Sequence, residues 1–123
     1  MMIDVDVFGG GGGRETSLWL NPSPSSNYTG GSASLSDDID NYEYLEFQMK
    51  NSTTDASPNF FIRLSVSSIK SAGLGVFVGN QSGWTRRVGY TNDTTISITQ
   101  TYEIAGSGRS DNQMIPYQIL GIS

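Results

Sequence analysis

The chain has 123 residues, which suits one domain of ordinary size and leaves little room for two. It has no Cys and no His, which excludes disulfides, thiolate nucleophiles, Cys or His metal sites and every catalytic triad that uses a histidine. The formal net charge of −5 disfavours nucleic acid and anionic membrane surfaces as partners. No apolar run approaches the roughly 20 residues of a membrane span, and the acidic start predicts no signal peptide.

The first 13 residues read as an arm that precedes the domain at 14–123. Apolar side chains alternate along residues 2–8 as in a strand, and five glycines follow. A flexible linker is the alternative interpretation, but we expect an anchoring arm held by a neighbour. Its residues are Ile3, Val5, Val7, Phe8, Gly9, Gly10, Gly11, Gly12 and Gly13.

From residue 14 onward the chain reads as short strands and turns. Only 36% of residues are hydrophobic and 15% are charged, both below the usual values of about 45–50% and about 25%. No stretch of helix-forming residues has a 3.6-residue period. We therefore expect an all-β fold, an antiparallel β-sandwich or jelly roll of about eight strands. The expected strands cover residues 16–20, 33–36, 42–50, 60–67, 74–79, 84–91, 94–101 and 113–122.

The alternation within two of these strands predicts which side chains face the core. The inward set is Leu45, Phe47, Met49, Ile62, Leu64 and Val66. The solvent-facing set is Glu46, Gln48 and Lys50. A hairpin-like turn at Asn92 and Asp93 is expected to join the strands at 84–91 and 94–101.

An acidic cluster precedes and enters the strand at 42–50: Asp37, Asp38, Asp40, Glu43 and Glu46. As a calcium loop it lacks the third oxygen ligand and the turn glycine. As a paired-carboxylate glycosidase site it has the residue types, but no substrate cleft is visible in the sequence. We interpret it as an exposed turn and the wet face of a strand, and we expect no metal, no cofactor and no enzymatic activity.

Aromatic residues with polar neighbours favour sugar recognition near the expected hairpin. The candidate glycan-binding residues are Trp84, Arg86, Tyr90, Asn92 and Asp93, all expected at one end of that hairpin. Packing in the core or between subunits is the alternative role for the aromatic members.

Three segments together resemble a domain frequent in tail and fibre proteins of phages and prophages. Residues 18–24 read LWLNPSP, which is similar to that domain's LW-x-NPSP start, and residues 34–45 are similar to its SL-x-x-x-I-x-x-Y-D-Y-[IL] stretch. Residues 115–122 resemble its IP-x-x-I-x-GI ending. The likeness covers residues 17–47 and 113–122, whereas the middle matches only in strand rhythm.

The resemblance implies a trimeric β-domain on a virion surface, of tail-fibre, head-fibre or capsid-decoration type. We expect a non-enzymatic structural protein that is made in the host cytoplasm, forms a homotrimer and attaches to other virion proteins through its N-terminal arm. Outward loops would aid attachment to a host cell-surface glycan, without binding nucleic acid or inserting into a membrane. The alternatives left open are a stand-alone carbohydrate-binding module and a small polysaccharide hydrolase that uses the acids at 38–46.

Overall fold

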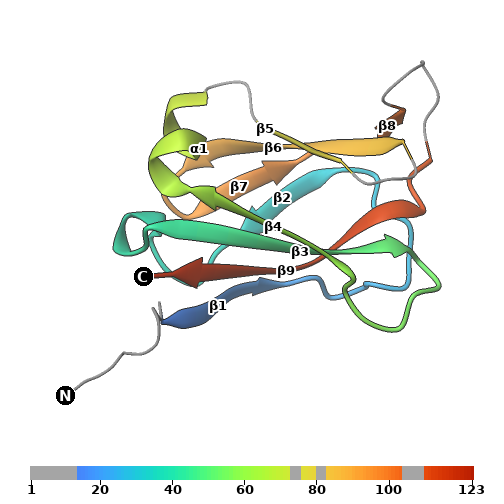
Figure 1. Cartoon of the computed structure of the whole chain (residues 1–123), viewed down its shortest axis with the longest axis horizontal. Helices are drawn as coiled ribbons and strands as arrows, with labels where there is room; N and C mark the ends of the chain where they lie inside the picture. The colour runs from blue at the N-terminus through green and yellow to red at the C-terminus, as the bar shows by residue number, and fades with distance from the viewer. Residues whose placement is uncertain (1–13, 73–75, 80–82, 104–109) are drawn as a thin grey trace.

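The computed structural model describes residues 14–72, 76–79, 83–103 and 110–123, and these form two antiparallel sheets packed face to face (Figure 1). One sheet has the order β1 (Glu15–Leu20), β9 (Gln113–Ile122), β3 (Tyr44–Ser52) and β4 (Phe60–Ser65). The other has the order β2 (Gly31–Ser34), β7 (Thr95–Ile98), β6 (Trp84–Asn92) and β5 (Val76–Gly79), and β8 (Tyr102–Glu103) also pairs with β6. The helical segments are η1 (Ile39–Asn41) and α1 (Val66–Ala72). The all-β sandwich is thereby confirmed.

Strand β9 lies between β1 and β3 and makes the last segment of the chain an interior part of the sheet. Its register places Ile119 opposite both Trp19 of β1 and Phe47 of β3. The loop after β1 is tied to the same strand, because Asn21 donates from Nδ2 to the carbonyl of Pro116 at 2.7 Å. The three segments that resemble the phage domain are therefore neighbours in space.

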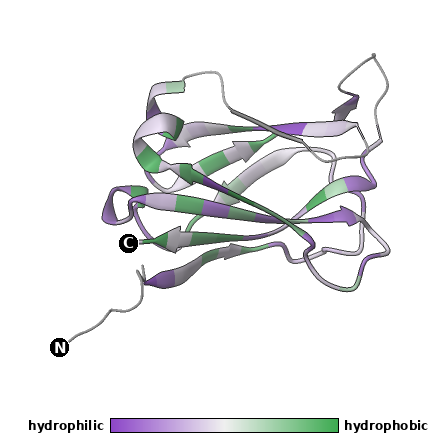
Figure 2. Ribbon diagram, in the orientation of Figure 1, coloured by the Kyte–Doolittle hydropathy of each residue, from purple (hydrophilic) through white to green (hydrophobic). Residues whose placement is uncertain are grey.

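The buried core takes apolar side chains from both sheets. Hydrophobic residues occur along strands of both layers (Figure 2). Leu45, Phe47 and Met49 are buried, as their alternation predicts, and Ile62 and Leu64 are partly buried against the same cluster. The opposite sheet contributes Val88, Ile96 and Ile98.

The prediction that Lys50 faces solvent is wrong, because the residue is only 2% exposed. The loop after β1 covers this end of the sheet, and the Lys50 ammonium donates to the carbonyl of Pro24 at 2.8 Å and of Thr53 at 3.3 Å. The alternation fixes the face on which a side chain lies, but not whether a distant loop covers that face.

The strand expected at 60–67 ends at Ser65, where helix α1 begins. The hydroxyl of Ser65 accepts a hydrogen bond from the backbone N–H of Ser68 at 3.1 Å, which is the N-cap interaction. Val66 and Ile69 are both buried, and their spacing of three fits one face of a helix. Val66 therefore reaches the core from a helix and not from a strand.

The remaining boundaries shift by small amounts. Asn92 pairs with Thr95, so the tight turn between β6 and β7 consists of Asp93 and Thr94. The strand expected at 94–101 is shorter in the structure, because β7 ends at Ile98 and residues 99–101 connect it to β8. The strand expected at 74–79 is described only as β5, which takes the last position in its sheet's order.

Arg86 connects the two sheets from within. Its side chain is 0% exposed and projects from β6 toward the beginning of β9, where the guanidinium donates to the carbonyls of Met114 and Gln113. It also donates to the carbonyl of Thr99 at 2.8 Å and lies 5.1 Å from the ring centroid of Tyr28. Met114 has φ of 52°, a left-handed conformation that costs a non-glycine residue about 1–2 kcal/mol, so its hydrogen bond to Arg86 holds a strained point of the chain.

Arg86→Met should destabilise the domain strongly. It keeps a long side chain but removes every donor, leaving buried carbonyls of β9 without their partner, and we expect a loss of about 3–5 kcal/mol in the free energy of unfolding. Urea denaturation measures the loss. Arg63→Met is the control, since Arg63 is exposed and its ion pair with Glu46 is worth at most about 1 kcal/mol. Equal losses in the two variants would contradict this role of Arg86.

Candidate functional site

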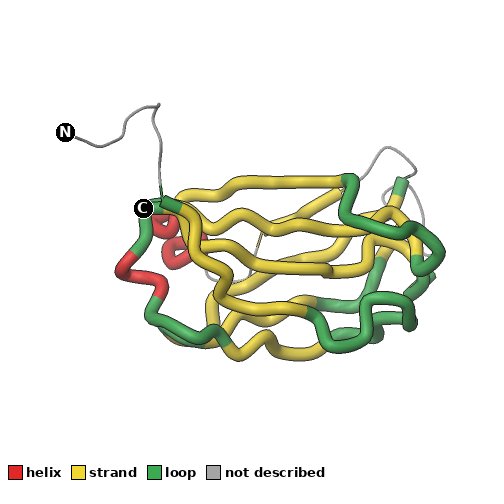
Figure 3. Tube along the Cα trace, turned by 90° about the horizontal axis from the view of Figure 1, so that it is seen from below, coloured by secondary structure: helices red, strands yellow, loops and turns green. Residues whose placement is uncertain are grey.

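One end of the sandwich gathers the helical segments and both ends of the described domain. In Figures 1 and 3, η1, α1, the start of β1 and the C-terminus lie at the same end. Arg14 and Ser123 exchange backbone hydrogen bonds of 3.2 and 3.0 Å. The backbone N–H of Ile39 donates to the carbonyl of Asp93 at 2.8 Å, which joins η1 to the β6–β7 turn. Segments far apart in the sequence therefore meet here, and we call this the helical end.

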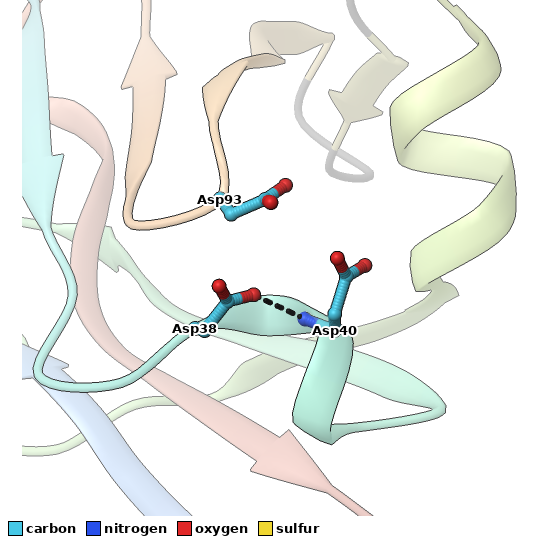
Figure 4. A group of neighbouring side chains, drawn as sticks. All are labelled: Asp38, Asp40 and Asp93. Carbon is cyan, nitrogen blue, oxygen red and sulfur yellow. Dashed lines mark hydrogen bonds between the residues drawn. The ribbon is translucent and has the colours of Figure 1, made fainter.

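Three carboxylates converge at the helical end (Figure 4). One oxygen from each of Asp38, Asp40 and Asp93 lies within 4.8 Å of the others. The Asp38 carboxylate caps η1 by accepting from the backbone N–H of Asp40 at 2.8 Å. The acidic turn predicted from the sequence is therefore brought against the β6–β7 turn.

Lys70 of α1 supplies the positive charge of this group. Its ammonium lies 2.7 Å from Asp40 and 3.3 Å from Asp93, and 5.6 Å from the ring centroid of Tyr90. The hydrogen bond to Asp40 is the main cause that raises the pKa of Lys70, so the ammonium stays charged. Because this cation already contacts two of the three carboxylates, we assign the group to an ion-pair network and not to a metal site.

Tyrosine hydroxyls hold two of the nearby carboxylates as anions. Tyr90 donates to Asp93 at 2.6 Å, and this hydrogen bond is the main cause that lowers the pKa of Asp93, with Lys70 contributing further. Tyr42 donates to Asp37 at 2.8 Å, which likewise lowers the pKa of Asp37. The site is consequently anionic, with Lys70 as its cation.

A hollow of about 530 Å³ opens beside this network. Its lining comes from the η1–β3 connection, the end of β4 and the first turns of α1: Asp40, Tyr42, Glu43, Tyr44, Ser65, Val66, Ser67 and Lys70. The ring of Tyr42 can take its place only because Gly121 has no side chain, since a Cβ there would lie 2.6 Å from the ring. Strand β9 therefore shapes the hollow as well as the sheet.

Two lining groups are available to a ligand. Glu43 is exposed and Tyr44 is 39% exposed. Within the part of the chain that the structure describes, neither the Glu43 carboxylate nor the Tyr44 hydroxyl takes part in a hydrogen bond or ion pair. Asp40 and Lys70, by contrast, are engaged with each other. The hollow thus offers an aromatic face, an unpaired carboxylate and the serine hydroxyls of the α1 start.

The candidate glycan-binding residues do not form one site. Tyr90, Asn92 and Asp93 lie at the helical end, where Asn92 stabilises the turn by accepting from the backbone N–H of Thr94 at 3.0 Å. Trp84 begins the nine-residue strand β6, so it lies about 26 Å from Asn92 at a rise of about 3.3 Å per residue. Arg86 is buried and faces the carbonyls of β9. The prediction that Trp84 and Arg86 lie with Tyr90 at one end of the hairpin is therefore wrong.

The arm residues Ile3, Val5, Val7, Phe8 and Gly9–Gly13 lie outside the described residues. Among the site residues that the sequence did not single out, Lys70 and Ser65 matter most. The pattern Ser65-Val66-x-x-Ile69, a capping residue followed by apolar residues three apart, was the available signal for α1 and hence for the position of Lys70.

No protein-family model matches the chain, and no curated protein is significantly similar to it. Of the helices in the described ranges, none has the length and apolar character needed to cross a bilayer. Function must therefore be argued from the site itself.

The lowered pKa values of Asp37 and Asp93 predict acid sensitivity. Each carboxylate adds stability above its unfolded pKa of about 4, and that stability is lost as the pH falls through the lower folded pKa. In Asp93→Asn, the midpoint of thermal unfolding should therefore fall less steeply between pH about 4.5 and about 2 than in the unmodified chain.

Tyr90→Phe should flatten the same dependence, because it removes the main cause of the Asp93 shift. Asn92→Ala is the matched control on the same turn: it removes a neutral acceptor and should lower the midpoint without changing its slope with pH. Identical slopes in Asp93→Asn and the unmodified chain would refute the assignment.

Proposed function

We propose that this chain is a bacteriophage virion structural protein of fibre or decoration type. In this proposal it is a homotrimeric β-sandwich on the virion surface that binds host-surface carbohydrate in the hollow at the helical end. The observation that carries the binding role is the combination of an exposed aromatic ring, Tyr44, with the exposed carboxylate of Glu43 at the rim of that hollow.

The chemistry of the hollow suits a sugar. Sugar rings present C–H faces that pack on an aromatic ring, and hydroxyls that donate to carboxylates and exchange hydrogen bonds with serine hydroxyls. The volume of about 530 Å³ falls within the usual range of small-molecule sites, about 300–1,000 Å³. Because Asp40 and Lys70 neutralise each other, a neutral saccharide can bind without displacing a charged group.

The virion role rests on the sequence resemblance, which the adjacency of β1, β9 and β3 supports. Residues 17–47 and 113–122 resemble the phage domain, and the strands β1, β9 and β3 that these ranges reach are neighbours in one sheet, whereas β2 belongs to the other sheet. The chain would attach to other virion proteins through residues 1–13 and act without catalysis, nucleic acid or membrane insertion.

A stand-alone carbohydrate-binding module is the second candidate, and the same hollow favours it. The two proposals share the ligand and differ in assembly. A trimer that is incorporated into particles favours the virion role, whereas a monomer that binds glycans and is absent from particles favours the module.

A glycan array followed by calorimetry on the best binder tests the sugar role. We expect the unmodified chain to bind, and Tyr44→Ala to weaken binding at least about tenfold, the equivalent of about 1.4 kcal/mol of lost contact with the sugar face. Glu43→Gln should weaken binding as well, because an amide accepts sugar hydroxyls less strongly than a carboxylate.

Tyr102→Ala is the matched control, since Tyr102 is exposed to a similar degree but lies on β8 in the other sheet. Its binding should equal that of the unmodified chain. Absence of binding to every glycan, or an equal loss in Tyr102→Ala, would reject the hollow as a sugar site. Release of shorter sugars from a bound oligosaccharide would instead support the hydrolase alternative.

A further inference from the structure

Three large hydrophobic side chains are exposed on the outer face of the four-stranded sheet. Leu20 is 60% exposed, Phe61 is 54% exposed and Tyr44 is 39% exposed. Each is next in sequence to a residue that belongs to the core or packs against it. Leu20 follows Trp19, Phe61 precedes Ile62 and Tyr44 precedes Leu45. Since side chains alternate between faces, these three point away from the core.

The register places two of them at the ends of a single row. Leu20 on β1 lies opposite Gln118 on β9, Gln118 lies opposite Gln48 on β3, and Gln48 lies opposite Phe61 on β4. We call these four residues the outer row. The outer row crosses all four strands, with an exposed hydrophobic side chain at each end and two glutamines between them.

The outer row carries no charge in a chain whose net charge is −5. In the adjacent row, Glu46 and Arg63 neutralise each other in an ion pair of 3.0 Å. The anionic groups Asp38, Asp40 and Asp93 lie at the helical end instead. Two copies of an acidic chain repel each other least across such a neutral surface.

We propose that the outer row is the surface through which copies of this chain associate. This inference rests on the proposed homotrimer and names the face that forms it. Within the chain, Gln48 donates one amide N–H to Glu46 at 2.9 Å and Gln118 donates one to the Ser17 hydroxyl at 2.8 Å. Each amide keeps a second N–H and its carbonyl oxygen, so a second copy is the occupant that the row fits, because the same amides of a sister chain can donate and accept in return. The two apolar ends lie on the outermost strands of the sheet, so in a closed ring Leu20 of one copy can pack against Phe61 of the next.

Light scattering of the full chain after size-exclusion chromatography tests the proposal. The unmodified chain should have three chain masses at micromolar concentration. The double variant Leu20→Glu with Phe61→Glu should have one, because it places like charges at every contact. Tyr102→Glu is the matched control, being a similarly exposed residue outside the outer row, and should keep three chain masses.

Circular dichroism of each variant establishes folding, and Leu20→Ser with Phe61→Ser replaces the charged pair if that pair does not fold. A double variant that still has three chain masses would overturn the outer row as the contact while leaving the homotrimer intact. An unmodified chain with one chain mass would overturn both the outer row as a contact between copies and the homotrimer. In that case residues 1–13 or another virion protein would cover the row. Sugar binding measured on the same samples reports separately on the attachment role.

Discussion

The buried guanidinium of Arg86 is the interaction on which the arrangement of the two sheets depends. It projects from β6 and satisfies carbonyl oxygens at the beginning of β9, including that of Met114 in its left-handed conformation. A buried cation is stable only when its donors are satisfied, so this contact fixes where β9 begins relative to β6. From that point β9 runs between β1 and β3 to the other end of the sandwich.

The helical end follows from the course of β9. Gly121, near the end of that strand, leaves room for the ring of Tyr42, whose hydroxyl holds Asp37. The η1 turn is then close enough to the β6–β7 turn for Lys70 to bridge Asp40 and Asp93. The hollow lies beside this network, and Lys70 and Asp40 of its lining are paired with each other. The end of the sandwich that holds Arg86 is thus fixed by buried contacts, whereas the opposite, helical end carries the exposed hollow in which we propose that a ligand binds.

Regular alternation made much of the fold predictable, whereas contacts between distant segments did not follow from the sequence. Leu45, Phe47 and Met49 are buried because a strand with one solvent-exposed face alternates apolar and polar side chains, and this pattern can be read from the local sequence. Lys50 obeys the same pattern but is covered by a loop 26 residues earlier in the chain. Lys70 joins the acidic turn 30 residues away, and no local signal predicts that ion pair. Trp84 and Tyr90 are close in sequence, but the extended strand β6 that carries both places them far apart in space.

The proposed function requires a sugar-binding hollow on a trimer carried by a virus particle, and the composition of purified particles tests it most directly. Mass spectrometry of density-gradient-purified particles from the host that produces the chain should detect it in a copy number divisible by three. Antibody against the chain should label intact particles and block their attachment to cells. Purified, infectious particles that lack the chain would contradict the account.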